Sequence, residues 1–78
     1  MAQIDIENIV KVEKQRITVH ERVYAEYTVF TKNGNRYLQI DTFGRSDREN
    51  PGKISQSFQI DEEAAHFIID LLNKEFDL

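Results

Sequence analysis

The sequence predicts an α+β domain in which a four-stranded antiparallel β-sheet is followed by one C-terminal α-helix packed on one face (β-β-β-β-α). Residues 3–60 contain runs rich in β-branched and aromatic residues, and an Asn-Gly pair separates two of these runs. After Asp61 the apolar spacing changes to that of a helix. One helix on one face of such a sheet makes one hydrophobic core, so we expect residues 1–78 to form a single domain.

The first two strands are expected within residues 3–14 and 16–31. In residues 3–14 the apolar spacing fits a helix or a strand, and the predominance of isoleucine and valine favours the strand. Residues 16–31 are also rich in β-branched and aromatic side chains. Both segments are therefore predicted to contribute strands that precede the Asn-Gly pair.

The third and fourth strands are expected on either side of a polar loop. Asn33-Gly34 is a strong hairpin signal because a type I′ turn needs positive φ at both central residues. The return strand is expected over residues 36–43. Asn50-Pro51-Gly52-Lys53 suits a type II turn, and a further strand is expected over residues 53–60.

The C-terminal helix has a clear beginning and a clear apolar stripe. Asp61 is a good N-cap, and Glu62 and Glu63 suit the positive end of the helix dipole. Lys74 lies near the expected end of the helix. The stripe has helical spacing and consists of Ala64, Ala65, Ile68, Leu71, Leu72 and Phe76.

Composition limits the classes of protein to which the chain can belong. The chain has 78 residues, no cysteine and a formal net charge of −4. A domain this small buries only about 60% of its unfolded surface, and it has no disulfide or thiolate metal site, so we expect a homodimer. We find no signal peptide and no segment of roughly 20 apolar residues, and we expect a cytoplasmic protein without a membrane span. The negative charge argues against a general polyanion binder but allows a local basic surface.

The predicted hairpin divides its side chains between two faces of the sheet. A two-residue turn places Phe30 opposite Tyr37 and Tyr24 opposite Phe43. The helix stripe should pack on a core face formed by Val23, Ala25, Tyr27, Val29, Leu38, Ile40, Phe58 and Ile60. The second face should carry the two aromatic pairs together with Glu26, Thr28, Gln39, Asp41, Lys53, Ser55, Ser57 and Gln59.

This second face suggests two kinds of binding surface. Aromatic rings flanked by cations are typical of proteins that bind single-stranded nucleic acid. The stacking residues would be Tyr24, Phe30, Tyr37 and Phe43, and the phosphate-binding residues would be Arg36, Arg45, Arg48 and Lys53. The alternative is that the same aromatic face docks a protein partner or a second copy of the chain.

The predicted register also sets Glu26 opposite Asp41, which is unfavourable for like charges. A bulge, an intervening arginine or a divalent metal would each resolve this conflict. The metal reading implies a third hypothesis, an enzyme subunit that uses both carboxylates. Recognised catalytic motifs are absent, since Gly44 and Gly52 are too far apart for a phosphate-binding loop. We therefore expect no enzyme activity, no cofactor and no metal site.

Three short motifs carry a resemblance to a known family. An aromatic residue ends the third strand at Phe43, a Gly52-Lys53-Ile54 step follows a polar loop, and Asp61-Glu62-Glu63 opens the helix. With these motifs, residues 37–72 resemble the single-stranded-DNA-binding domain of the transcriptional coactivator positive cofactor four and its small bacterial relatives. The resemblance implies a homodimer with four antiparallel strands and one helix. It also implies a non-enzymatic role in transcription, through binding of single-stranded DNA or RNA.

Overall fold

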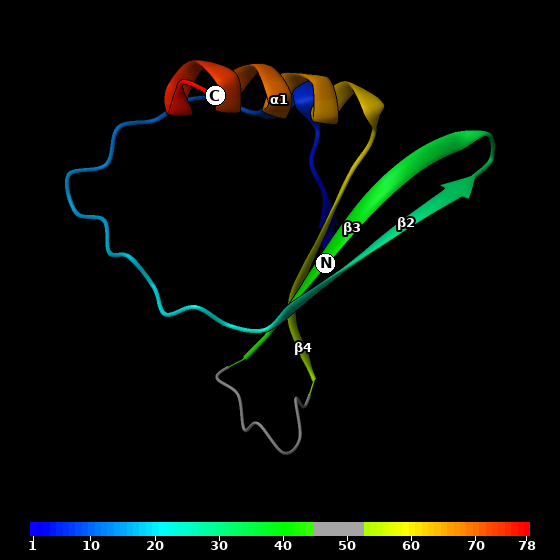
Figure 1. The fold of residues 1–78 in the computed structure, drawn as a ribbon, viewed down its shortest axis with the longest axis horizontal. Helices are drawn as coiled ribbons and strands as arrows, with labels where there is room; N and C mark the ends of the chain where they lie inside the picture. The colour runs from blue at the N-terminus through cyan, green and yellow to red at the C-terminus, as the bar shows by residue number, and fades with distance from the viewer. Residues whose placement is uncertain (45–52) are drawn as a thin grey trace.

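The computed structural model describes residues 1–44 and 53–78, which form one mixed sheet with a helix at one end (Figure 1). The described strands follow the order β1-β4-β3-β2. The predicted α+β class, with four strands and a C-terminal helix, is confirmed. The elements are β1 (Ala2–Gln3), a 3-10 helix η1 (Ile6–Asn8), β2 (Ala25–Lys32), β3 (Asn35–Phe43), β4 (Ile54–Ile60) and α1 (Glu62–Phe76).

The β2–β3 hairpin has the predicted turn and the predicted register. Asn33 has φ 53° and Gly34 has φ 81°, as a type I′ turn requires. Lys32 pairs with Asn35, and the pairing continues without a shift to Ala25 opposite Thr42. The turn therefore sets which side chains share a face along the whole hairpin. The second predicted turn rests on residues 50–52, which lie outside the described residues.

A bulge in β4 changes which residues share a face at the end of the sheet. Thr42 pairs with Gln56, but Phe43 pairs with Ile54, so Ser55 is the extra residue. Ile54, and not Ser55, is therefore opposite Phe43. The prediction that Ser55 continues the alternation of the second face was wrong, because alternation holds only while one residue opposes one residue.

The N-terminal part of the chain differs most from the prediction. Of the strand expected over residues 3–14, only Gln3 is in a strand, as the second residue of β1. This strand pairs with β4 in parallel, with Ala2 opposite Phe58. The all-antiparallel sheet was therefore wrong. The Asp5 side chain accepts a hydrogen bond from the Glu7 backbone at 3.0 Å and begins η1, which ends the strand. Parallel pairing requires a long connection, and the chain from residue 4 to residue 53 supplies one.

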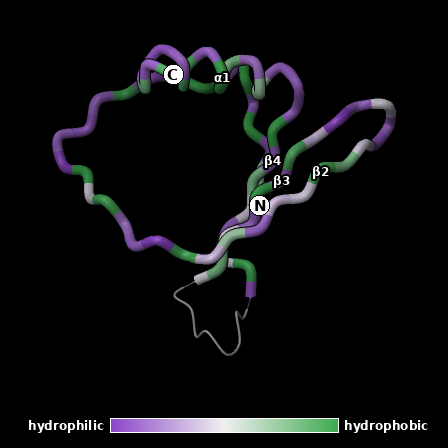
Figure 2. The backbone as a smooth tube through the Cα atoms, in the orientation of Figure 1, coloured by the Kyte–Doolittle hydropathy of each residue, from purple (hydrophilic) through white to green (hydrophobic). Residues whose placement is uncertain are grey.

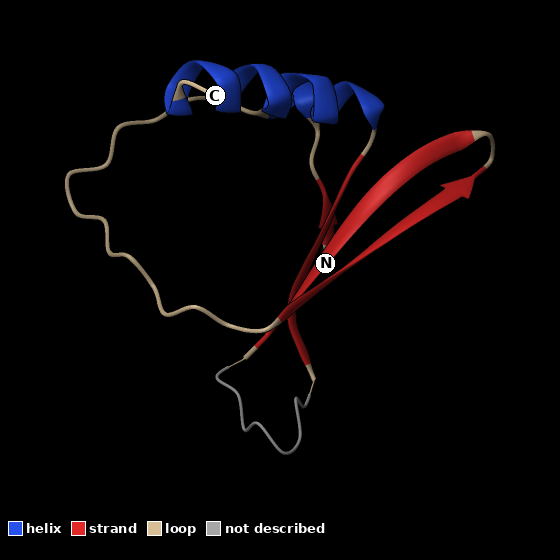
Figure 3. Cartoon of the chain, viewed as in Figure 1, coloured by secondary structure: helices blue, strands red, loops and turns tan. Residues whose placement is uncertain are grey.

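Residues 9–24 contain no strand or helix, although a strand was expected from residue 16. This segment leaves the region of α1 and curves round to the start of β2 (Figure 3). β-branched residues favour strands mainly because they fit a pleated surface beside a partner strand. These residues have no partner strand in the sheet, and for this reason their β propensity does not produce one.

The helix begins and ends as the sequence predicts. The Asp61 side chain accepts a hydrogen bond from the Ala64 backbone at 2.9 Å, and Lys74 lies in the last turn. Only its first turns rest on the sheet: Ala64 is buried, and Ala65 lies beside Leu38 and Ile60. The rest of α1 extends away from the strands (Figure 1). The helix therefore covers one end of the predicted core face rather than its full length.

Candidate binding face of the sheet

The aromatic face is the sheet surface defined by alternation on β2, β3 and β4 and by Tyr24 directly before β2. It carries both predicted cross-strand ring pairs. The Tyr24 and Phe43 rings lie 5.4 Å apart at 50°, and the Phe30 and Tyr37 rings lie 5.3 Å apart at 23°. Its members are Tyr24, Glu26, Thr28, Phe30, Lys32, Asn35, Tyr37, Gln39, Asp41, Phe43, Ile54, Ser57 and Gln59.

The two ring pairs differ in what they offer to a ligand. Phe43 is only 9% exposed, while Tyr24 is 53% exposed. The Phe43 backbone N–H donates to the Tyr24 carbonyl at 3.0 Å and holds the two residues together. The buried Phe43 ring therefore packs against the Tyr24 ring, and Tyr24 is the ring of this pair that a ligand can reach. Phe30 and Tyr37 are both half-buried, and their rings stack nearly parallel.

Between the ring pairs runs a continuous row of polar side chains. The Gln59 amide donates to the Gln39 carbonyl oxygen at 2.8 Å, and the Gln39 amide donates to Asp41 Oδ1 at 3.0 Å. Ser57 Oγ donates to the same oxygen at 2.6 Å. We call these four residues the polar ladder. Every buried side-chain polar atom in residues 1–44 and 53–78 has a hydrogen-bond partner.

Hydrogen bonds compensate the repulsion that the sequence predicts between Glu26 and Asp41. The two residues are directly opposite, as the register predicted. Asp41 takes its donors from β3 and β4, while Glu26 accepts the Tyr24 hydroxyl at 2.9 Å. The Glu26 hydrogen bond, and then its charge, raise the pKa of Tyr24 above its ordinary value. Neutral donors therefore compensate both carboxylates, in place of the arginine or metal that the sequence suggested.

The predicted cations are not all on this face. Arg36 shares the strand parity of Leu38, lies beside Asp61 and Glu62, and donates to Thr31 Oγ1 at 3.2 Å. Strand alternation therefore places it on the core side of the sheet, away from the Tyr37 ring. Lys53 is exposed directly before β4, and the bulge at Ser55 breaks the alternation that was expected to place Lys53 on this face. The remaining two, Arg45 and Arg48, lie outside the described residues.

Sequence reasoning missed one cation and the polar ladder. Lys32 has the parity of Phe30 and pairs with Asn35, so it lies on the aromatic face next to a ring pair. The alternation that identified Phe30 could have identified Lys32. The polar ladder also requires the β3–β4 register, which places Gln39 opposite Gln59 and Asp41 opposite Ser57. Residues 44–53 contain no two-residue turn signal that would have set this register.

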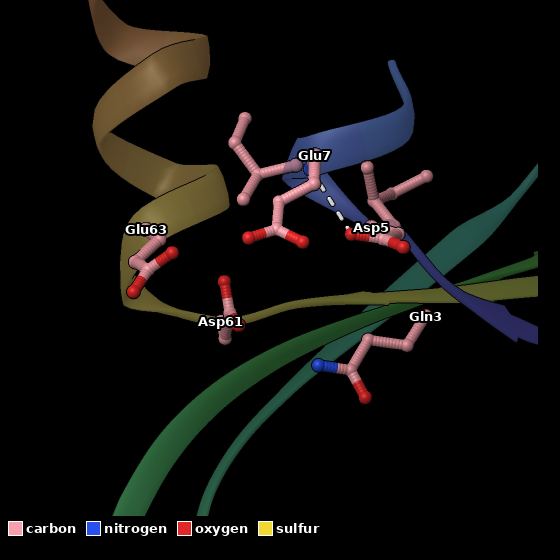
Figure 4. Close-up of a pocket in the computed structure, with 7 residues that line it drawn as sticks. Gln3, Asp5, Glu7, Asp61 and Glu63 are labelled. Carbon is pink, nitrogen blue, oxygen red and sulfur yellow. Dashed lines mark hydrogen bonds between the residues drawn. The ribbon is translucent and has the colours of Figure 1, made fainter.

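A second group of carboxylates lies where β1 and η1 approach the start of α1 (Figure 4). Asp5, Glu7, Asp61 and Glu63 line a hollow of about 320 Å³. Asp5 accepts bonds from the Asn8 side chain and the Glu7 backbone, and these bonds lower the pKa of Asp5. Asp61 caps α1. The two aspartates are thus explained by local backbone structure, and within the described ranges no three acidic or histidine side chains are arranged to hold a metal ion.

Within the described part of the chain, no helix has the length and apolar character needed to cross a bilayer. Comparison of the chain with models of known protein families, with curated proteins and with solved structures found no match. The resemblance to the positive cofactor four family therefore stays a prediction.

Proposed function

We propose that this chain is a non-enzymatic module that binds single-stranded DNA or RNA on its aromatic face. The observation that carries the proposal is the presence of two ring pairs on one face, with the polar ladder between them. Tyr37 and Phe43 are six residues apart on β3, so the pairs are about 20 Å apart at roughly 3.4 Å per residue. Such a face offers two stacking positions joined by a polar strip.

In this proposal Tyr24 provides one stacking surface, with Phe43 beneath it. Phe30 and Tyr37 provide the second surface. Each base stacked on an aromatic ring contributes roughly 1–3 kcal/mol, whatever the base. Amide groups such as those of Gln39 and Gln59 can both donate and accept hydrogen bonds, which suits the edges of bases.

The phosphates would be neutralised by cations near the ends of the face. Lys32 lies beside the Phe30–Tyr37 pair, and Lys53 is exposed at the start of β4. Arg45 and Arg48 keep the role that the sequence suggested for them. Arg36 lies on the opposite side of the sheet and is left out of the proposed surface. The cytoplasmic location expected from the sequence stays a prediction.

The test is fluorescence anisotropy of labelled poly-dT, titrated with the protein at low and moderate salt. We expect binding that weakens as salt rises, because bound cations release counterions from the strand. Tyr37→Ala should weaken binding by about 5- to 150-fold with little change in the salt slope. Lys32→Glu should weaken binding and flatten the slope, while Lys14→Glu, in the segment before β2, is the matched charge reversal away from the face and should leave both unchanged.

No binding at tens of micromolar protein in low salt would refute the proposal. Equal effects of Lys32→Glu and Lys14→Glu would remove Lys32 from the surface. The folded state of each variant is checked by circular dichroism, so that a loss of binding is not mistaken for a loss of structure.

A second candidate is a protein-interaction domain that docks a partner on the same face. Glu26 and Asp41 are carboxylates in the middle of the face, and the chain has a net charge of −4. Both features repel phosphates and are compatible with a protein surface. Under this candidate poly-dT does not bind at any salt concentration, and Lys32→Glu and Lys14→Glu behave alike.

A further inference from the structure

The chain exposes far more surface than a folded domain of its mass. Its accessible surface is 7467 Å², whereas a folded monomer of 9.2 kDa exposes about 4,900 Å². Its radius of gyration is 14.8 Å, whereas about 11.5 Å is typical of a compact domain of this length. The excess is about 2,500 Å² per chain. Residues 45–52 lie outside the described residues and can contribute at most about 1,400 Å² of this excess, so at least about 1,100 Å² belongs to the described part of the chain.

The hydrophobic core is correspondingly small. Among the described residues, the buried hydrophobic side chains are Phe43, Ile60 and Ala64, and no large side chain is fully buried. Figure 2 shows hydrophobic residues along the segment from η1 to β2, which runs outside the sheet. A chain this open lacks the burial that normally offsets the entropy of folding.

Two parts of the chain carry most of the uncovered apolar surface: the irregular segment of residues 9–23 and the helix α1. The apolar surface on α1 is ordered along one side of a regular element. At 100° per residue, the apolar positions from Phe67 round to Ile69 span about 200° of the helix, and Glu75 is the only charged residue on this arc. An amphipathic helix that rests on one surface needs an apolar stripe of only about 100°. The side chains that remain exposed are Phe67, Ile69, Leu71, Leu72 and Phe76.

This apolar arc continues into a groove and onto the sheet. Ile9 and Val10 lie along one side of the arc and form an apolar groove of about 320 Å³ with Phe67, Leu71 and Leu72. On the core face of β2, Tyr27 is 75% exposed and Val29 is half-exposed, because α1 covers only the end of the sheet. All of these surfaces are on the helix side of the sheet, opposite the aromatic face.

We propose that a second copy of this chain covers the apolar arc of α1 and the uncovered core face of β2. Permanent homodimer interfaces bury roughly 1,000–2,500 Å² per partner and are depleted of charge, while a standard transient interface buries about 800 Å². The excess of the described part of the chain, at least about 1,100 Å², falls in the permanent range. A permanent partner must be present in equal amount whenever the chain is made, and its own copy meets that condition. The two copies would complete one core between them.

The experiment is sedimentation equilibrium of the wild-type chain from a few to a few hundred micromolar, with thermal unfolding at the same concentrations. We expect a mass of twice 9.2 kDa. We also expect the melting temperature to fall by about 4–5 °C for each tenfold dilution, because unfolding separates the copies. A folded chain of single mass with a melting temperature independent of concentration would overturn the proposal, and so would a mass above two copies.

A matched pair of variants places the interface. Leu72→Glu puts one negative charge on the apolar arc, and Asn73→Glu puts the same charge on the polar side of α1. We expect Leu72→Glu to lose the dimer, with either a twofold lower mass or a loss of the folded state, and Asn73→Glu to keep the dimer. Leu72→Glu that remains a folded dimer would overturn this placement. Because Leu72→Glu can simply unfold, the wild-type mass and melting slope decide the proposal independently.

The dimer and the binding of single-stranded nucleic acid can each be refuted without the other. Tyr37 lies on the opposite face, so we expect Tyr37→Ala to keep the mass of two copies. A dimer that does not bind poly-dT would refute only the proposed function. A monomer that does bind poly-dT would refute only the dimer.

Discussion

Asp41→Ala should destabilise the protein through the polar ladder. Asp41 is 6% exposed and lies in the centre of the sheet, where its Oδ1 accepts from both Ser57 Oγ and the Gln39 amide. Alanine removes the acceptor and leaves two donors without their partner. Ser57 is buried as well, so water cannot easily replace the lost carboxylate.

The size of the effect follows from these two bonds. A hydrogen bond to a charged group contributes about 1.5–3 kcal/mol, and a buried donor without a partner costs about 1–3 kcal/mol. The substitution also removes the repulsion between Glu26 and Asp41, which restores about 0.2–1 kcal/mol of the lost stability. We therefore expect Asp41→Ala to reduce the free energy of unfolding by about 2–4 kcal/mol. Asp41→Asn keeps an acceptor oxygen and should cost about 1 kcal/mol.

The assay is urea unfolding at one fixed protein concentration, because association would otherwise shift the midpoint. Asp70→Ala removes one carboxylate from an exposed position of α1 and serves as the matched control, with a change within about 0.5 kcal/mol. In a double-mutant cycle, Asp41→Ala and Ser57→Ala should be less than additive, since either one breaks the same bond. A loss below about 0.5 kcal/mol for Asp41→Ala, or full additivity, would show that the ladder does not stabilise the sheet.

Two further predictions concern the hairpin and the Tyr24 hydroxyl. Gly34→Ala should lower the free energy of unfolding in chemical denaturation by about 1–2 kcal/mol, because Gly34 has φ 81°. Gly44 has equally open space around its Cα, and Gly44→Ala should leave the free energy of unfolding unchanged or raise it by about 0.4–1 kcal/mol. Equal effects of the two substitutions would contradict the turn assignment. The raised pKa of Tyr24 means that its interaction with Glu26 contributes stability below pH 10.0 and is lost as pH rises through the folded-state pKa. Glu26→Gln should therefore lower the pKa of Tyr24 in an NMR titration of the tyrosine rings, and an unchanged pKa would show that this contact does not form in solution.

The parts of the fold that were predicted correctly depend on short-range chemistry. Asn33-Gly34 tolerates positive φ at two successive residues, and this local property alone determines the β2–β3 register and both ring pairs. The helix could be predicted equally well, because the Asp61 side chain caps it through a hydrogen bond from a backbone group only three residues away. The aromatic side chains of the candidate face followed directly from the register.

The parts that were wrong or missed depend on contacts between distant segments. The isoleucines and valines of residues 4–23 favour a strand, but whether one forms depends on a free sheet edge, and only Ala2–Gln3 pairs at the edge of β4. The bulge at Ser55 and the polar ladder depend on the β3–β4 register, which the turn predicted at residues 50–53 does not set, because the connection between the two strands is longer than a two-residue hairpin turn. Arg36 was predicted in the candidate site but lies on the other face, and Lys32 was not predicted there but lies on the aromatic face. The reason is that strand parity, and not closeness to an aromatic residue in the sequence, decides the face of each side chain.

Local sequence was thus sufficient for the hairpin, the helix, the α+β class and the aromatic pairs, because turns, caps and alternation act over two to four residues. The direction of β1, the irregular path of residues 9–24 and the compensation of Asp41 were decided by tertiary contacts. Each depends on which backbone edge or donor remains free once the other elements are in place. The exposure of the apolar side of α1 was also decided by tertiary contacts. The sequence predicts the apolar stripe, but only the folded chain shows how little of it the sheet covers.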